Sequence, residues 1–351
     1  MRIWWLALTV VVASAACAAC GDDEDIPDFG PAPVRSPHAT GGPADAATSL
    51  NPRLLRRFRP LPEPPAGTDA VVALGKQLFY DPRLSKHGDV ACNTCHPLAE
   101  FGADHATTSR GNEGQRGPRN APTVLNAGLQ AAQFWDGRAA SLTEQVRGPL
   151  FNPVEMALAG PDQLVAALAK AGYRPVFAAA FPGDRDAMSF DHAALALASF
   201  ERTLLTPARW DQFLDGDAGA LTAPEIAGAK LFADIGCVQC HTGTLVGGSM
   251  FQKVGVAEVW PDQDDQGRYQ VTHLDADRMV FKVPSLRNVT RTAPYFHDGR
   301  AKELPDAIRM MGRYQVGVEL TDDEIVSIAR WLATLESPLP ATVTTPPALP
   351  R

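Results

Sequence analysis

Two pentapeptides with the same spacing decide the architecture: Cys92-Asn93-Thr94-Cys95-His96 and Cys237-Val238-Gln239-Cys240-His241. In each, the two thiols lie on one turn of the chain and can form thioether bonds with the two vinyl groups of a single haem. The histidine beside the second thiol, His96 or His241, can then ligate the iron. The sequence therefore predicts two covalently attached haems of the c type.

A redox-active dithiol and a zinc site are the alternatives for such motifs. The dithiol is disfavoured because the motif occurs twice and no thioredoxin-like βαβ pattern surrounds it. Zinc could be held by all four cysteines or by a mixed set of cysteine and histidine. The other two of the six cysteines, Cys17 and Cys20, lie near the N-terminus, so the rest of the chain has none left for a structural disulfide.

The N-terminus has the features of an export signal. Arg2 precedes an apolar run over residues 3–12, and small residues follow as far as Cys17 and Cys20. The run is too short to cross a bilayer as a helix. A cysteine after small residues resembles a bacterial lipoprotein cleavage site, for which Cys20 is favoured over Cys17; an ordinary signal peptide is the alternative. We therefore predict a periplasmic protein that is anchored to the membrane as a lipoprotein.

The composition fits a globular protein of two domains. The chain has 351 residues, of which 45% are hydrophobic, and a formal net charge of -8. This charge disfavours nucleic acid as a partner and is compatible with docking of a small basic redox protein. Apolar residues recur mostly at helical spacing and strand-like alternation is scarce, so we predict a mainly α fold.

An internal repeat relates the two haem motifs. Residues 75–79 (GKQLF) resemble residues 228–232 (GAKLF), and residues 134–138 (FWDGR) resemble residues 296–300 (FHDGR). We therefore expect two cytochrome c-like haem domains related by this repeat. The predicted division is residues 1–20 as a signal peptide of the lipoprotein type, 21–66 as a flexible tether with some order near 54–58, 67–215 as the N-terminal haem domain, 216–336 as the C-terminal haem domain and 337–351 as a flexible tail.

Local signals mark several helix starts. Thr222 with Glu225, and Thr321 with Glu324, have the spacing of capping boxes. Residues 243–283 show no periodicity and are predicted to form a long irregular loop.

With these motifs in place, residues 68–335 resemble the bacterial dihaem cytochrome c peroxidases, whose wider family includes dihaem enzymes that modify tryptophan. The resemblance is carried by residues 78–85 (LFYDPRLS), 117–120 (GPRN), 134–138 (FWDGR), 152–156 (NPVEM) and 292–297 (TAPYFH). It implies a peroxide-reducing haem in the first domain and an electron-receiving haem in the second.

For the first haem, the resemblance implies His96 as the proximal ligand and Glu155 as a distal acid. A carboxylate there can take a proton from bound peroxide and return it to the leaving oxygen. Gln145 matches a polar neighbour in the same pocket, and Trp135 matches an aromatic residue between the haems. Taken alone, Glu155 could be a surface charge and Trp135 an ordinary core residue.

For the second haem, the resemblance implies His241 as the proximal ligand and Met311 as the distal one. A thioether ligand raises the reduction potential, which suits a haem that receives electrons. The adjacent Met310 and the nearby Tyr314 are alternatives, because the tryptophan-modifying relatives use a tyrosine. His297 matches a histidine near this haem.

The resemblance also implies a calcium ion between the domains. Asn120, Thr292 and Pro294 match its ligands, the last two through their carbonyl oxygens, in keeping with the preference of calcium for oxygen. Hydrogen peroxide is the implied substrate, and a small cytochrome c or a copper protein is the implied electron donor. Members of the family are often homodimers.

One position departs from the family. Typical members carry a histidine in the loop after the first haem motif, which closes the peroxide-reducing iron in the oxidised state. That position is Asn112 here, and asparagine is a poor iron ligand. His105 lies seven residues earlier and is better explained as a solvated loop residue. We predict that the first haem is open even when both irons are ferric.

Three functions are compatible with these features. The main prediction is reduction of hydrogen peroxide to water with electrons from a small redox protein. The alternative is a dihaem oxidase that modifies a protein or small-molecule partner through high-valent iron, and an open first haem strengthens it. Pure electron transfer with both irons capped is disfavoured by Glu155 and by the absence of the histidine lid.

Overall fold

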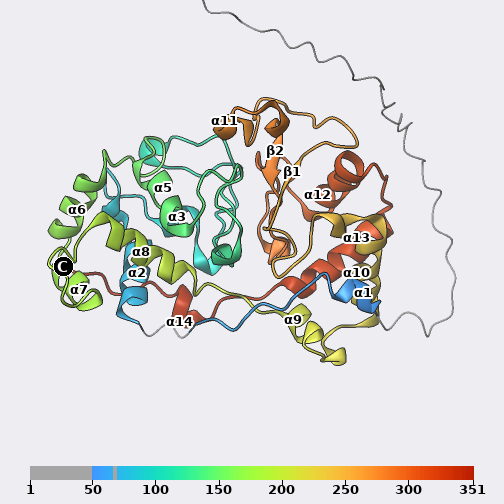
Figure 1. Cartoon of the computed structure of the whole chain (residues 1–351), viewed down its shortest axis with the longest axis horizontal. Coiled ribbons are helices and arrows are strands. Elements are labelled where there is room, and N and C mark those ends of the chain that lie inside the picture. Colours follow the sequence, from blue (N-terminus) through green and yellow to red (C-terminus); the bar gives the residue numbers. More distant parts are fainter. Residues whose placement is uncertain (1–49, 66–68) are drawn as a thin grey trace, which may run out of the picture. The chain divides into compact units, whose positions relative to one another are not determined.

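A pair of crossed helices forms the framework of the first part of the chain. Helices α2 (Ala70–Tyr80) and α8 (Phe190–Glu201) pack against each other in the computed structural model, which describes residues 50–65 and 69–351 as part of one compact unit (Figure 1). They approach closely at Gly75, where a Cβ atom would lie 1.9 Å from the carbonyl oxygen of Ala196. Glycine is therefore required at this crossing.

A second crossed pair follows the same plan. Helices α10 (Ala223–Ile235) and α13 (Asp322–Leu332) meet at Gly228, where a Cβ atom would lie 2.1 Å from the carbonyl oxygen of Ser327. Both helices begin at the predicted capping boxes, Thr222 with Glu225 and Thr321 with Glu324. Each N-cap contributes about 1 kcal/mol to the stability of its helix.

The remaining helices are short, and strands are few, which confirms the predicted mainly α class. The other α-helices are α1 (Pro52–Leu55), α3 (Cys92–Cys95), α4 (Leu142–Gln145), α5 (Arg147–Phe151), α6 (Pro161–Lys170), α7 (Arg174–Ala180), α9 (Arg209–Leu214), α11 (Tyr269–Thr272), α12 (Leu304–Met310) and α14 (Ala341–Thr344). Within the described ranges, no helix is long and apolar enough to cross a membrane.

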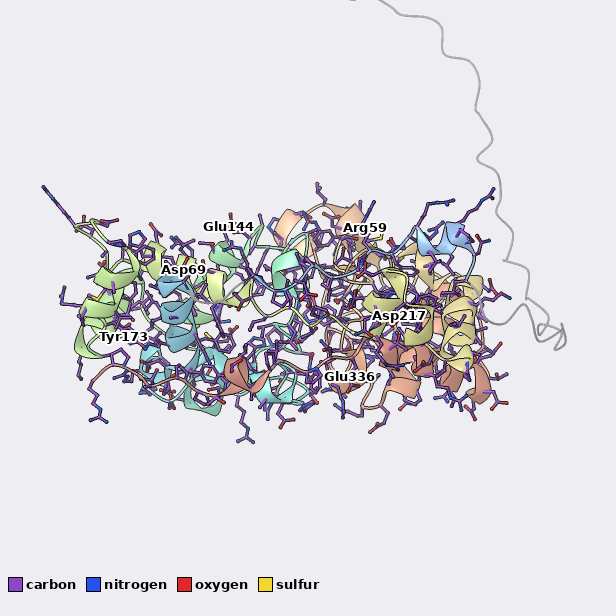
Figure 2. The ribbon with its side chains drawn as sticks, turned by 90° about the horizontal axis from the view of Figure 1, so that it is seen from below. Arg59, Asp69, Glu144, Tyr173, Asp217 and Glu336 are labelled. Atoms are coloured by element: carbon purple, nitrogen blue, oxygen red, sulfur yellow. The ribbon has the colours of Figure 1, made fainter. Side chains whose placement is uncertain are left out.

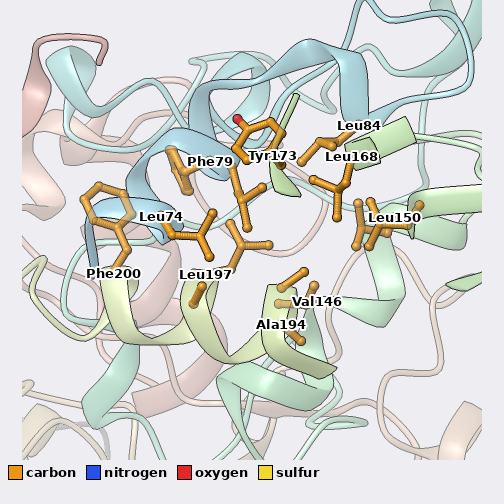
Figure 3. Close-up of a cluster of buried hydrophobic side chains, with 14 of the residues drawn as sticks. Leu74, Phe79, Leu84, Val146, Leu150, Leu168, Tyr173, Ala194, Leu197 and Phe200 are labelled. Carbon is orange, nitrogen blue, oxygen red and sulfur yellow. The ribbon is translucent and has the colours of Figure 1, made fainter. Parts of the chain in front are cut away.

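The first core fills the space between α2, α8 and the shorter helices α5, α6 and α7. Its largest fully buried side chains include Phe177 and, as Figure 3 shows, Phe79 and Tyr173. The Tyr173 hydroxyl donates a hydrogen bond of 2.8 Å to Asp81, which also pairs with Arg83. The buried carboxylate of Asp81 is thus fully engaged, as burial of a charge requires.

The second core is built around Trp331 of α13. Trp210 and Phe58 meet its ring edge-on, with ring centroids 5.4 and 6.2 Å away. Trp210 lies on α9, so the predicted boundary at residue 215 differs from the packing: α9 belongs to the second core. Asp211, beside Trp210, binds the buried Arg287 at 2.5 and 2.7 Å.

Both ends of the described chain cross over to the other core. Residues 50–65, predicted as tether, pack on the second core through Leu50 and Phe58, and the Leu61 N–H donates to Asp211. After Glu336 (Figure 2), residues 337–351 return to the first core, where Leu339 is buried. The tail expected to be flexible is therefore packed in place.

Hydrogen bonds explain why this tail packs despite its proline content. Proline lacks an N–H but keeps its carbonyl, and the tail is held through carbonyl oxygens. Tyr80 donates to Thr344 at 2.8 Å, Lys76 to Thr342 at 2.7 Å and Arg83 to Pro350 at 3.0 Å.

The segment predicted as one irregular loop, 243–283, contains a short antiparallel hairpin. Strands β1 (Phe251–Lys253) and β2 (Val280–Lys282) pair with Phe251 opposite Lys282 and Lys253 opposite Val280. Each strand has only three residues, too few for a recognisable alternation of apolar and polar side chains.

Equivalent positions after the two haem motifs adopt the same unusual backbone. Asn126 and Asn288 have φ of 61° and 57°, and Phe134 and Phe296 have φ of 66° and 71°. Two reciprocal hydrogen bonds then join these segments: the Lys282 N–H donates to the Trp135 carbonyl, and the Asn120 N–H to the His297 carbonyl, both at 2.7 Å.

The predicted signal peptide, Cys17, Cys20 and most of the predicted tether lie outside the described residues.

Candidate functional site

The first haem motif opens onto a cavity of about 470 Å³, here called the first cavity. Cys92, Cys95 and His96 line it together with Gln145 and Glu155. The two thiols lie on the single turn of α3, as the spacing predicts. Gln145 closes α4, and Glu155 follows α5, so the structure brings these residues to one cavity from separate segments of the chain.

The second motif opens onto a cavity of about 430 Å³, here called the second cavity. Cys237, Cys240 and His241 line it, and so do Met311 and His297. No carboxylate side chain is among its lining residues in the described ranges.

Both motif histidines have a hydrogen bond at Nδ1 that leaves Nε2 available as a metal ligand. His96 Nδ1 lies 3.2 Å from the Gly102 carbonyl, and His241 Nδ1 lies 3.2 Å from the Val246 carbonyl. A carbonyl only accepts, so Nδ1 carries the proton and Nε2 keeps its lone pair. Burial lowers the pKa of both imidazoles, that of His241 to about 4, which favours the neutral ligand form.

The four motif cysteines form no disulfide in the described part of the chain. Each pair lies in a cavity with a histidine oriented in this way, so the residues present fit two haems attached through thioether bonds.

Glu155 is held in the first cavity by its neighbours. The Asn152 side-chain amide donates to a Glu155 carboxylate oxygen at 2.6 Å. Burial raises the pKa of Glu155, while the bond from Asn152 and the charge of Arg138 oppose that rise. A raised pKa makes the carboxylate a stronger base, so Glu155 can accept a proton and return it in a later step.

Asn112 does not line the first cavity in the described structure. It is buried, its N–H donates to the Glu155 carbonyl at 2.7 Å, and its side-chain amide donates to the Pro153 carbonyl at 3.1 Å. The loop of Asn112 therefore supports the segment that carries Glu155. His105 is also away from the cavity, with Nδ1 3.0 Å from the Ala293 carbonyl.

Among the three candidates for the distal side of the second cavity, only Met311 lines it. Met310 packs against the second core, and the Tyr314 ring packs on Trp260 with centroids 5.4 Å apart. Met311 begins a π-helical turn, η10 (Met311–Val316). Such turns are rare and often occur at functional sites, because the extra residue re-aims the side chains around it.

Trp135 lies in the wall shared by both cavities. Its indole N–H donates to the Asn120 carbonyl at 2.9 Å, and its ring centroid is 6.4 Å from that of His297. His297 is buried and stacks on Phe281 with centroids 4.1 Å apart. Trp135 and His297 therefore form part of a continuous aromatic contact beside the second cavity.

The candidate calcium ligands Asn120, Thr292 and Pro294 all line the second cavity. The Asn120 amide nitrogen donates to the Ala106 and Thr107 carbonyls, which leaves the amide oxygen as a possible ligand. Within the described residues, no group of three or more His, Cys, Asp or Glu side chains could hold a metal ion. A cation here would depend on neutral oxygens and water, a donor set suited to a hard cation such as calcium.

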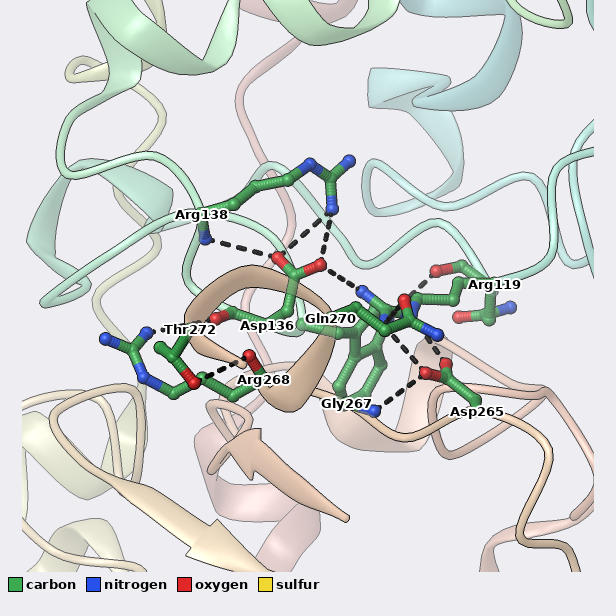
Figure 4. A network of polar contacts seen from close by, with 10 residues as sticks. Arg119, Asp136, Arg138, Asp265, Gly267, Arg268, Gln270 and Thr272 are labelled. Carbon is green, nitrogen blue, oxygen red and sulfur yellow. Dashed lines mark hydrogen bonds and ion pairs between the residues drawn. The ribbon is translucent and has the colours of Figure 1, made fainter. Parts of the chain in front are cut away.

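A network of charged side chains beside the first cavity was not assigned a role from the sequence. Arg119 bridges Asp136, at 2.5 Å, and Asp265, at 2.6 Å (Figure 4). Arg138 also binds Asp136, at 2.9 Å. Three of these residues, Arg119, Asp136 and Arg138, lie in the motifs GPRN and FWDGR. Asp265 is 146 positions from Arg119, and no sequence pattern marked it.

A second missed residue is Glu201, at the end of α8. Its side chain lines the first cavity, and burial raises its pKa to about 7. A single glutamate at the end of an apolar helix gives no sequence signal of such burial.

Comparisons with known proteins agree with this geometry. The family model for di-haem cytochrome c peroxidase matches residues 69–219. A cytochrome c551 peroxidase from Nitrosomonas europaea is 48% identical over 271 residues, 76% of this chain and 80% of that protein. A cytochrome c551 peroxidase from Pseudomonas aeruginosa is 41% identical over 85% of this chain and 89% of its own. A crystal structure of a MauG-like protein associated with microbial copper homeostasis superposes with a TM-score of 0.72 at 28% identity, covering 82% of this chain and 95% of that one.

Proposed function

The chain belongs to the di-haem cytochrome c peroxidase family, and from this premise we propose that it reduces hydrogen peroxide to water with electrons from a small redox protein. As a cytochrome-c peroxidase it is an oxidoreductase acting on peroxide. The observation that carries the proposal is that the two cavities share a haem motif but differ in their other lining: Glu155 and Gln145 in the first, Met311 in the second.

Proton transfer in the first cavity is the role of Glu155. Reduction of one peroxide to two waters consumes two protons and two electrons. The Glu155 carboxylate would take a proton from one peroxide oxygen and return it to the other, which leaves as water. Asn152 fixes the orientation of the carboxylate, and Gln145 supplies a further polar group to the bound peroxide.

The haems, when bound, supply the iron that binds peroxide in the first cavity and the redox centre that accepts single electrons in the second. Met311 and His241 would hold the second haem, and His96 would hold the first. Trp135 lies in the wall that both cavities share, and we assign it to the electron path between them. His297 packs beside the second cavity and supports this wall.

Several further assignments belong to this proposal. The chain forms two haem domains related by an internal repeat, which the matching backbone geometry after each haem motif supports. Helix α9 and residues 50–65 belong to the second of these domains. Asn120, Thr292 and Pro294 hold calcium. The protein is periplasmic, with a lipid anchor at Cys20 or Cys17, its donor is a small cytochrome c or copper protein, and it assembles as a homodimer.

We also propose that the first iron is open in the fully oxidised enzyme. Asn112 stands at the position where typical members of the family have the closing histidine. Its side-chain amide donates to the Pro153 carbonyl and its N–H donates to the Glu155 carbonyl, which supports this proposal. Peroxide could then bind without prior reduction of the second centre.

Two measurements test the function. Low-temperature EPR of the diferric protein should show a high-spin first haem; a purely low-spin spectrum with a bis-histidine haem contradicts the open site. Steady-state assays with reduced cytochrome c or a copper protein should show rapid peroxide consumption. Oxidation of another partner without donor turnover would favour the modifying oxidase, and no reaction with peroxide would favour an electron carrier.

A further inference from the structure

A lysine is buried at the end of the short hairpin. Lys282 closes strand β2, and only 5% of it is exposed. Its ammonium group donates to the Ala132 carbonyl at 2.9 Å and contacts the side-chain oxygen of Gln130. Both partners are neutral, although a buried ammonium is usually paired with a carboxylate.

Lys282 lies where the two cavities meet. Eight residues line both cavities, and Lys282 alone among them is charged; the others are Asn120, Ala121, Pro122, Thr123, Gln130, Phe134 and Trp135. Its backbone N–H donates to the Trp135 carbonyl at 2.7 Å, which fixes the lysine against the shared wall.

No carboxylate of the described residues is available to this lysine. None has an oxygen within 4.0 Å of the ammonium nitrogen. The charge of Asp136 raises the pKa of Lys282, but the Asp136 carboxylate is already bound by Arg119 and Arg138. Burial lowers the pKa of Lys282 to about 8, which reflects the cost of keeping this charge without a counter-ion.

Among the described residues, the lining of the second cavity also lacks an anionic side chain. Its lining has two lysines, Lys253 and Lys282, and no carboxylate. Each haem carries two propionate carboxylates, which need cationic or hydrogen-bonding partners when they leave water. Lys253 is exposed, so solvent screens its charge, whereas Lys282 is buried and can form a strong pair.

We propose that Lys282 binds a propionate of the haem in the second cavity, at the wall shared with the first. The inference rests on the proposed haem occupancy but not on the ligation of the first iron. Since the lysine backbone is bonded to Trp135, this pair would tie the edge of the electron-receiving haem to the segment that separates the cavities. A cation there favours the reduced haem and so raises its midpoint potential.

The test compares three variants of the two-haem protein by spectroelectrochemistry and resonance Raman spectroscopy. Lys282→Gln removes the buried charge, Lys282→Arg keeps it, and Lys253→Gln removes an exposed charge from the same cavity. We expect Lys282→Gln to lower the midpoint potential of the methionine-ligated haem clearly more than Lys253→Gln does. Lys282→Arg should restore the potential and shift the propionate bending band, because a guanidinium binds carboxylate with a different geometry.

Two results would overturn the proposal. One is an equal fall in potential for Lys282→Gln and Lys282→Arg, since the charge would then be irrelevant. The other is a propionate band that is unchanged in Lys282→Arg, which also decides the matter if Lys282→Gln fails to retain both haems. Neither result bears on peroxide turnover, so failure here is distinguishable from failure of the proposed function.

Discussion

The two cavities start from the same local plan and end with different linings. In each, a glycine allows two helices to cross, at Gly75 and Gly228, and a motif histidine turns its Nδ1 to a loop carbonyl. The first cavity then adds acidic and amide side chains from residues 145–155. The second adds a thioether from the π-helical turn η10.

The equivalent positions in the shared wall show the same division. Trp135 of the first segment corresponds to His297 of the second, and Asn120 corresponds to Lys282. The backbones of these four residues are joined by the two reciprocal hydrogen bonds, while their side chains differ completely. The comparison teaches that backbone geometry can be kept while side chains at a few positions set the chemistry of each centre.

The largest expected effect concerns the acid that only the first cavity has. Glu155→Gln removes the proton acceptor and should lower kcat for peroxide by about 100-fold or more, the usual contribution of a general acid–base group. Haem absorption spectra should not change. Glu144→Gln, an exposed glutamate of α4, is the matched control and should retain full activity. Equal activity of the two variants would remove Glu155 from the mechanism.

The pH dependence should follow from the same group. Burial raises the pKa of Glu155, and only the deprotonated carboxylate accepts a proton, so kcat/KM should fall as the pH decreases through that raised pKa. The profile of Glu155→Gln should lack this limb, and retention of the limb would assign it to another group.

The second prediction concerns a variant in which both irons would have two protein ligands, as the second is proposed to have already. Asn112→His restores the lid residue of the family, and we expect the diferric variant to lose most of its initial turnover until the second haem is reduced. EPR should then show a low-spin first haem. Asn112→Gln, which keeps an amide, serves as the control and should stay high-spin; a high-spin spectrum for the histidine variant would mean that the loop cannot reach the iron.

A third change removes the thioether from the second cavity. Met311→Leu should lower the midpoint potential of the second haem and slow donor-driven turnover, because the iron loses its distal thioether ligand. Met310→Leu is the matched neighbour, since Met310 packs against the second core and does not line the cavity. If Met310→Leu had the larger effect on the potential, the ligand assignment would be off by one residue.

The smallest effects test what the two halves share. Gly75→Ala and Gly228→Ala should each lower the free energy of unfolding by about 1–3 kcal/mol through overpacking. Their Cβ atoms would lie 1.9 and 2.1 Å from carbonyl oxygens of the facing helices. Gly160→Ala, where a Cβ would meet no atom within 4 Å, is the control for thermal or denaturant unfolding. A large difference between the first two would show that the crossings are not equivalent.

Glu201 offers a stability test with a defined sign. Its pKa is raised from 4.5 to about 7 in the folded protein, so the folded state binds more protons than the unfolded one between these values. The stabilisation is complete below pH 4.5 and is lost as the pH rises through about 7. Glu201→Gln, which resembles the protonated form, should therefore be more stable than the wild type at pH 8, as measured by denaturant unfolding.

Features that are encoded locally can be predicted from the sequence. The haem motifs, the capping boxes at Thr222 and Thr321 and the mainly α class follow from short patterns, and the structure agrees with the last two. Glu155, Gln145 and Met311 came from the family resemblance, and the structure brings each to the cavity expected of it.

Features that depend on distant partners were missed. Lys282 and Arg119 look like ordinary surface charges in the sequence, because their burial is created by segments more than 100 positions away. The hairpin was missed because its strands are too short to show alternation. The tail was misjudged because a proline-rich composition says nothing of the donors on α2 that bind its carbonyl groups.

The crossing of the tail has a consequence for the order in which the two cores can fold. Leu339 completes the first core, and the Arg351 carbonyl lies close to Gly172. Leu339 follows both haem motifs in the sequence, so the first core cannot be completed before the segment that comes after the second core has folded back onto it. A gene cut between the two haem motifs would leave that core without its closing piece, and the second core would lose residues 50–65 in the same way. Neither haem centre should therefore be obtainable as an independent fragment cut at the predicted boundary.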